Sequence, residues 1–196
     1  MGTLHNSNQI STVKSRTGRM WMDRNLGALR VTQSVNDYQA YGWLYQWGRL
    51  ADGHELYCSP TLSSQSDGDD PDHGNFITSF PDWRDEPNDT LWQGVSGDNN
   101  PCPTGFRGPK ETEWETERAS WRSNDAAGAF ASPLRLVLAG YRSRSSGTYG
   151  DSGSHGYYWS STLDDIDAVH QYFWRSGAEM YWEYRAHGYS VRCIKH

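Results

Sequence analysis

Cysteine and aliphatic residues are scarce in this chain. The shortages limit the kind of hydrophobic core and the number of disulfides that it can form. Only 35% of the 196 residues are hydrophobic, so a core built mainly from Leu, Ile and Val is not expected. The three cysteines are Cys58, Cys102 and Cys193, and their spacing fits no zinc motif. An odd number leaves at least one thiol free or paired between chains. A Cys102–Cys193 bridge and a pair of reduced thiols both agree with the sequence, which leaves the redox compartment open.

Long apolar runs and an excess of positive charge are also missing. No stretch approaches the roughly 20 apolar residues of a membrane-spanning helix, so membrane insertion is not expected. The net charge is -6 and the basic residues form no cluster, which disfavours nucleic acid as a partner. The first residues lack the basic-then-apolar pattern of a secretory signal. The sequence therefore fixes neither the localisation nor the oligomeric state.

Motifs for catalysis and metal binding are missing as well. The chain has no Gly-x-Ser-x-Gly elbow, no phosphate-binding loop and no dinucleotide fingerprint. Residues 86–88 read Glu-Pro-Asn, a calcium-binding triplet of sugar-binding lectins, but the Trp-Asn-Asp segment that usually accompanies it is missing. The Asp-rich residues 67–73 lack the Glu that closes an EF-hand loop. We expect surface turns at both places, and no catalytic residue, cofactor or metal.

Aromatic residues and glycine are abundant instead. The 10 Trp and 12 Tyr can build a core, because each buries a large area and carries a polar group that can find a partner. The 20 Gly and 8 Pro indicate many turns and long loops. A single domain is expected for this length, with residues 1–17 as a loose N-terminal arm and residues 18–196 as the folded part.

Hydrophobic periodicity predicts an α+β fold with two helices, short antiparallel strands and long ordered loops. One helix is expected over residues 37–51, where apolar residues recur at helical spacing, and the other from residue 110, where acids occupy the first turn. Buried side chains should hold the long segment 52–108; these are Phe76, Ile77, Phe80, Trp83, Leu91 and Trp92. Strands are expected over residues 19–26, 134–138, 157–162, 168–174 and 189–194, with turns at 143–156, 163–167 and 175–178.

Five segments, in order along the chain, resemble one known family. They are residues 21–27 (WMDRNLG), 41–49 (YGWLYQWGR), 100–107 (NPCPTGFR), 156–162 (GYYWSST) and 188–193 (GYSVRC). They are similar to the Fibrobacter succinogenes major paralogous domain, from about residue 19 to the C-terminus. Gly108 and Lys110 depart from the Leu and Thr usual in the family before the second helix.

The resemblance implies a fold and a function. Many members are variable proteins of diversity-generating retroelements, in which an error-prone reverse transcriptase rewrites adenines near the 3′ end of the gene. Their fold is C-type-lectin-like, related to that of formylglycine-generating enzymes, with a constant scaffold and a variable C-terminal surface. We therefore expect a non-catalytic protein whose region from about 140 to 190 binds a protein or glycan on a cell or virion surface.

The composition of that region agrees with a binding surface. Eight of the 12 Tyr lie between Gly140 and Tyr189, mixed with Ser, Gly, His and Asp as in antibody paratopes. These residue types also arise readily when adenines of an Asn codon are changed. The predicted ligand-binding residues are Ser143, Ser145, Ser146, Tyr149, Asp151, His155, Tyr157, Asp164, Asp165, Asp167, His170, Tyr172, Trp174, Glu179, Tyr181, Trp182, Glu183, Tyr184 and His187.

Other residues are expected to form the scaffold beneath this surface. They are Trp21, Trp43, Trp47, Trp114, Trp159 and Val191. A strand through residues 181–184 would place side chains alternately on its two faces, so only about half of them can meet one ligand.

Three other readings stay open. A Gly-, Ser- and Tyr-rich tail can be scaffold and turns alone. The chain can be a surface adhesin or carbohydrate-binding domain of fixed specificity, because sugar sites use aromatic platforms. It can also be an enzyme of the formylglycine-generating type, which uses cysteines for copper chemistry.

Overall fold

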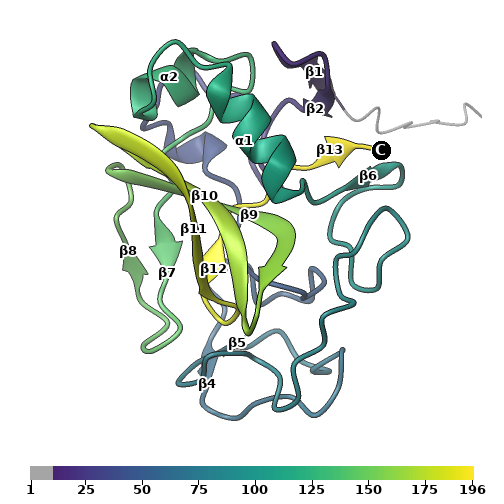
Figure 1. Ribbon diagram of the computed structural model, residues 1–196. Coiled ribbons are helices and arrows are strands. Elements are labelled where there is room, and N and C mark those ends of the chain that lie inside the picture. Colours follow the sequence, from purple (N-terminus) through teal and green to yellow (C-terminus); the bar gives the residue numbers. More distant parts are fainter. Residues whose placement is uncertain (1–10) are drawn as a thin grey trace, which may run out of the picture.

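The computed structural model describes residues 11–196 and shows an α+β architecture of short strands, two α-helices and long ordered loops (Figure 1). A three-stranded antiparallel sheet of longer strands crosses the middle of the molecule in the order β11-β10-β9. Its strands are β9 (His155–Asp164), β10 (Asp167–Trp174) and β11 (Gly177–Tyr184). These strands confirm the two predicted at 157–162 and 168–174, and they add β11 as an edge strand.

Strands from near both ends of the described chain share a second sheet, in the order β1-β2-β13-β6. Its members are β1 (Thr12–Lys14), β2 (Met20–Met22), β6 (Phe106–Arg107) and β13 (Ile194–Lys195). The expected loose arm is wrong for residues 12–14, because they pair with β2. Residues 1–10 lie outside the described part. Beside this sheet, Cys102 is bonded to Cys193, and Cys58 is free and exposed.

A third sheet has the order β3-β12-β7-β8 and brings the C-terminal segment against the early part of the chain. Its strands are β3 (Tyr45–Gln46), β7 (Tyr141–Arg142), β8 (Tyr149–Gly150) and β12 (Gly188–Tyr189). The strand predicted over 189–194 is thus divided into β12 and β13. The remaining pair, β4 (Thr61–Leu62) and β5 (Phe76–Ile77), is parallel.

Only one of the two α-helices forms where the hydrophobic periodicity predicts a helix. The helix expected from residue 110 is α1 (Glu111–Ala119), where the Glu113 side chain accepts a hydrogen bond from the backbone N–H of Lys110 and caps the first turn. The other helix is α2 (Ala126–Ala131), capped by Asp125. Neither helix of the described chain has the length and apolar character that crossing a membrane requires.

The helix predicted over residues 37–51 is wrong. Only a 3-10 turn, η1 (Tyr38–Ala40), forms there before β3 begins. Gly42 and Gly48 have φ values of +73° and +84°, a left-handed conformation that an α-helix cannot include. The apolar spacing therefore reflects a turning segment whose side chains enter the core from several directions.

The alternating leucines of residues 134–138 do not form the strand predicted there. Leu134, Leu136 and Leu138 are all buried against the helices, but they lie on an extended connection outside the sheets. Arg135 has a φ of +47°, which interrupts the regular strand conformation. The backbone N–H of Leu138 bonds to the Val35 carbonyl, so a loop takes the place of a neighbouring strand.

Two clusters of buried side chains cover the two faces of the β11-β10-β9 sheet. Tyr158 and Phe173 pack with Trp114 and Trp121 of the helix side, where α1 lies across the sheet (Figure 1). Trp159 faces the other way and packs among the loops. The alternation follows from the two-residue period of a strand.

The loop-side cluster explains how residues 52–108 stay ordered with so little regular structure. Phe76, Ile77, Trp83, Leu91 and Trp92 are buried there as predicted, and Phe80 is half-buried against them. Of the predicted scaffold residues, Trp21, Trp47, Trp114, Trp159 and Val191 are buried, whereas Trp43 is half-buried.

Candidate functional site

The predicted binding residues of the central sheet alternate between its two faces. Tyr158 and Phe173 point toward the helices, so Tyr157 and Tyr172 lie on the opposite face. The strand register sets Tyr172 directly across from Tyr157. This face is therefore the one on which β9 and β10 present aromatic side chains together.

Four half-buried rings on this face contact one another, and we call them the aromatic strip: His155, Tyr157, Tyr172 and Trp174. Tyr172 is at its centre, with ring centroids 4.9 Å from Tyr157, 4.8 Å from Trp174 and 5.6 Å from His155, all stacked. Rings held by neighbouring strands and by one another have little conformational freedom left to lose when a ligand binds.

Buried aromatic residues form the floor under the strip. Tyr157 stacks on Tyr189, with centroids 4.9 Å apart, and Tyr189 packs on Trp159 at 4.3 Å. Trp159 in turn donates its indole N–H to the Tyr45 carbonyl at 2.7 Å. The strip is therefore supported by a chain of contacts that reaches the scaffold.

His170 belongs to this floor, and its prediction as a surface residue is wrong. It is 2% exposed and lies between Trp159, Tyr181 and Tyr189. Burial lowers the pKa of His170 to about 3, so its imidazole is neutral at physiological pH. Strand alternation places His170 on the same face as Tyr172, and the rings of Tyr181 and Tyr189 cover it there.

The β7–β8 hairpin borders the strip on one side. Asp151, just after β8, accepts a hydrogen bond of 2.7 Å from the Tyr157 hydroxyl. Tyr149 is exposed and donates to the Tyr57 carbonyl at 3.0 Å. Ser145 and Ser146 are exposed at the loop between the strands, and Ser143 is half-buried. The hairpin thus carries a rim of hydroxyl groups and one carboxylate.

The edge strand β11 contributes to both faces. Tyr181 lies across from His170 and is 45% exposed. Trp182, the next residue, is 50% exposed on the helix-side face, in a pocket with Glu111 and Leu163. The alternation expected for this segment does not separate these two rings, because Tyr181 lines the same pocket as Trp182 and the two rings stack with centroids 4.9 Å apart.

The segment after β11 continues the surface past the strip. His187 stacks on Tyr189 with centroids 5.7 Å apart, and its Nε2 atom lies 3.9 Å from a Glu183 carboxylate oxygen. The Arg144 guanidinium lies 4.4 Å from the centroid of the Tyr184 ring. Burial lowers the pKa of His187, and the Glu183 carboxylate offsets part of that effect.

Carboxylates surround the aromatic residues at the far end of the sheet. Asp164 and Asp165 are exposed in the β9–β10 turn, and Asp167 is half-buried next to them. Burial, and then the nearby charges of Glu183 and Asp164, raise the pKa of Asp167. The like charges repel one another, and they give this end of the sheet a negative potential. Glu179 adds an exposed carboxylate on β11, across from Tyr172.

Sequence reasoning missed three residues of this surface. Tyr141 contacts the Tyr157 ring at 5.5 Å, Tyr189 lies beneath it, and Arg144 covers Tyr184. All three fall between residues 140 and 190, so their position was a usable signal. Their roles depend on the sheet order β3-β12-β7-β8, which no local pattern shows.

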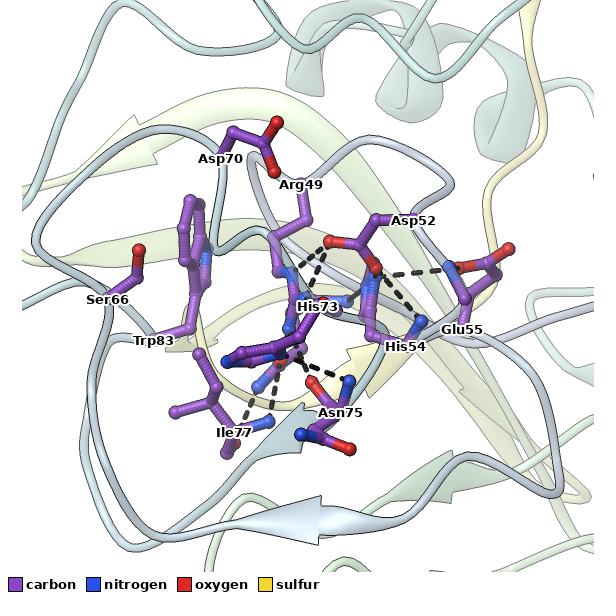
Figure 2. Close-up of polar contacts among 12 residues, drawn as sticks. Arg49, Asp52, His54, Glu55, Ser66, Asp70, His73, Asn75, Ile77 and Trp83 are labelled. Atoms are coloured by element: carbon purple, nitrogen blue, oxygen red, sulfur yellow. Dashed lines mark hydrogen bonds and ion pairs between the residues drawn. The ribbon is translucent and has the colours of Figure 1, made fainter.

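A second cluster of titratable groups lies away from this surface, at Asp52, His54 and Glu55 (Figure 2). Three potential ligand atoms come close together there, but both nitrogens of His54 are engaged. Nε2 accepts the backbone N–H of Gln46 at 3.0 Å, so Nδ1 carries the proton and donates to Asp52 at 2.7 Å. A metal would have to displace one of these bonds.

Arg49 makes that cluster a structural network and a poor cation site. Its guanidinium is buried, and each of its N–H groups has an acceptor: Asp52, the Gln46 side chain, and the carbonyls of Asn75 and His73 (Figure 2). The resident positive charge opposes a metal ion. The network ties the loop around residue 75 to β3.

The acidic loop and the Glu-Pro-Asn segment contact each other. Asp69 accepts hydrogen bonds from Arg84 and from the Asn88 side chain, the latter at 2.9 Å. Residue 88 therefore uses its amide to hold a loop, and both segments are turns at the surface, as expected.

Comparison of the chain with protein families, with characterised proteins and with solved structures yields no match. The functional assignment therefore depends on the residues and geometry described above.

Proposed function

We propose that this chain is a non-catalytic ligand-binding protein that presents a variable C-terminal surface on a constant aromatic scaffold. The observation that carries the proposal is the aromatic strip, whose stacked, half-buried rings lie beside exposed hydroxyl and carboxylate groups. Few of these side chains must rearrange to meet a partner, which favours binding. The ligand is a protein or glycan on a cell or virion surface.

We propose further that the fold is C-type-lectin-like and that the protein belongs with the variable proteins of diversity-generating retroelements. Two arrangements support this. Strands from both ends of the described chain share one sheet, and a long loop region bound to the core by tryptophans precedes the C-terminal strands. The segments that resemble the family contribute the scaffold, including Trp159, Val191 and the bonded Cys102 and Cys193.

The division between scaffold and surface supports variation in particular. Of the 19 predicted binding residues, His170 is the one that is buried; the others are exposed or half-buried. The buried aromatic residues that hold the sheet, such as Tyr158 and Trp159, stand outside that set. Substitution at the surface positions therefore leaves the core intact.

The gene itself gives the first test. We expect a reverse transcriptase gene nearby and a near-copy of the sequence that encodes residues from about 140 onward, with differences at adenines. Gene copies whose differences are spread evenly along the chain would refute the retroelement origin without bearing on ligand binding.

A randomised library gives a direct test of the surface. Codons for Tyr149, Asp151, Tyr172, Glu179 and Tyr181 would be randomised in one library, and those for Trp47, Tyr158, Trp159, Phe173 and Val191 in a matched control. We expect most clones of the first library, and few of the second, to resist a protease as the parent does. Equal loss in both would contradict the proposal.

A fixed carbohydrate specificity is the second candidate, and the stacked, half-buried rings of Tyr172 and Trp174 favour it. A glycan array with calcium and with a chelator tests it. Binding to one glycan class that is lost in a Trp174→Ala variant would support this candidate. A glycan-negative array combined with binding to a protein partner would exclude it.

The formylglycine-generating reading has the least support. Cys102 and Cys193 are bonded to each other, so neither supplies the thiol that copper chemistry needs. Measurement of copper binding by the reduced and the oxidised protein would test this reading.

A further inference from the structure

A groove lies between α2 and the part of the sheet where β9 begins and β10 ends, and two residues of the aromatic strip, His155 and Trp174, line it. Its volume is about 660 Å³. Volumes of roughly 300–1,000 Å³ are typical of pockets that hold small molecules. Trp174 is shared, since it stacks on Tyr172 in the strip and also lines the groove.

The walls of the groove are mainly apolar. Val35 and Leu138 come from the N-terminal and connecting segments, Phe130 comes from α2, and Trp174 comes from the end of β10. Aromatic side chains in two of these walls suit a flat, unsaturated ligand, because ring faces and edges attract one another. The scaffold supplies most of this lining, so the groove is not built chiefly from the predicted variable residues.

The permanently charged side chain of the described lining is a cation. Arg175 lines the groove, and none of the described lining residues is Asp or Glu. The guanidinium of Arg135 lies 5.4 Å from the Phe130 ring centroid, which places a second cation near the same wall. His155 also lines the groove, and its Nδ1 lies 2.8 Å from the Ser154 hydroxyl and 3.6 Å from an Asp151 carboxylate oxygen. In a chain of net charge -6, this local excess of Arg is a selective feature.

We infer that the groove binds a small aromatic anion, with the ring system between Phe130 and Trp174 and the acidic group at Arg175. The inference goes beyond the proposed function, because it concerns a different cavity and a small ligand. It requires neither variation of the surface nor a macromolecular partner. A guanidinium recognises carboxylates and sulfonates through paired N–H donors.

The test uses two probes on the intact chain, the anionic anilinonaphthalene sulfonate and its neutral analogue N-phenylnaphthylamine. Their binding would be followed by fluorescence titration and calorimetry. Ala127→Trp fills the groove from an exposed site on α2 that lines it. Ala131→Trp is the matched control, at an exposed position of the same helix outside the groove. Melting temperatures show that each variant is folded.

We expect the anionic probe to bind one site, and Ala127→Trp to weaken it by at least about tenfold while Ala131→Trp leaves it unchanged. Arg175→Gln, in an exposed turn, should weaken the anion by about tenfold and leave the neutral probe unaffected. The inference is overturned if the folded parent binds no anionic probe, or if Ala127→Trp does not affect binding. Equal effects of Arg175→Gln on both probes would overturn the preference for an anion.

Discussion

Single tryptophan residues hold distant parts of this chain together through both the ring and its N–H. The indole of Trp83 donates to the Trp47 carbonyl at 2.7 Å, and that of Trp47 donates to the Ser160 carbonyl at 2.9 Å. Trp114 donates to the Trp159 carbonyl at 3.2 Å. Each bond gives a buried backbone carbonyl a side-chain donor from a distant segment, which helps long loops stay buried with little regular structure.

The structural role of the buried tryptophans predicts that their substitution lowers the free energy of unfolding much more than substitution of an exposed residue does. Trp159→Ala should lower the free energy of unfolding by about 3–5 kcal/mol, because it removes a buried ring and its bond to Tyr45. Tyr181→Ala, at an exposed position, should change it by no more than about 0.5 kcal/mol. Denaturant titration measures both.

Once a ligand is identified, substitution of the exposed tyrosines should weaken its binding although it changes stability little. Tyr172→Ala, Tyr181→Ala and Tyr184→Ala are expected to weaken it, because binding energy concentrates in a few aromatic anchors. Equal thermal damage from these variants and from Trp159→Ala would refute the division.

The buried histidine His170 predicts a dependence of stability on pH. Its pKa is lowered from 6.5 to about 3 in the folded protein, so the unfolded chain takes up a proton first as the pH falls. The stability that His170 contributes is complete above about pH 6.5 and is lost as the pH falls toward 3. Burial raises the pKa of Glu117, which acts in the opposite direction, so the informative quantity is a difference between variants.

The measurement compares the parent with His170→Gln at pH 7.5 and at pH 5. On acidification the parent should lose more free energy of unfolding than the variant does. A parent-variant difference that stays constant over this interval would show that the imidazole does not titrate as described.

At the scale of elements, the sequence was informative where residues of high β propensity lie between turn clusters. This pattern predicted β9 and β10. The helix prediction for residues 37–51 failed because the apolar residues there have helical spacing, although Gly42 and Gly48 turn the chain. Helix α2 was missed because it is short and contains Gly128, although Asp125 is an N-cap signal.

The sequence indicated the region that forms the candidate site, but not how all of its side chains are arranged. Composition identified the region 140–190, but strand alternation did not separate Tyr181 from Trp182, whose rings stack on each other. The burial of His170 follows from the rings of Tyr181 and Tyr189 that cover it, and its local sequence does not indicate these contacts. The contribution of Tyr141 depends on a sheet in which the β7–β8 hairpin meets the distant strands β3 and β12.

The turn at Gly42 gives a test at this scale. A Cβ atom there would lie 2.3 Å from the Leu26 carbonyl oxygen, and the φ of +73° disfavours any other residue. Gly42→Ala should cost more than the roughly 1–3 kcal/mol of an unfavourable backbone conformation alone. Gly18→Ala is the control, since Gly18 has a φ of +86° with nothing within 4 Å. Equal losses in thermal stability would show that the contact with Leu26 does not matter.

At the scale of the whole molecule, the bond between Cys102 and Cys193 joins residues 91 positions apart. It links the end of the long loop region to the segment that follows the strip. Closing a loop of this size restricts the unfolded chain, and in the chain-entropy account it contributes about 4–5 kcal/mol.

Replacing both residues with Ser should therefore lower the free energy of unfolding by about 2–5 kcal/mol. Cys58→Ser should leave it unchanged, because that thiol is exposed and unpaired. Denaturation with and without a reductant provides the same comparison on the parent chain. An unchanged midpoint under reducing conditions would contradict the expectation.

The sheet that contains both β2 and β13 has a consequence for how the molecule can be tethered. Because these strands pair directly, Trp21 across from Ile194, the beginning and the end of the described fold emerge from one region (Figure 1). A carrier joined directly to residue 11 and one joined to residue 196 would thus both attach beside this sheet. Fusions at these two residues should both leave the strip, which belongs to another sheet, able to bind a soluble receptor.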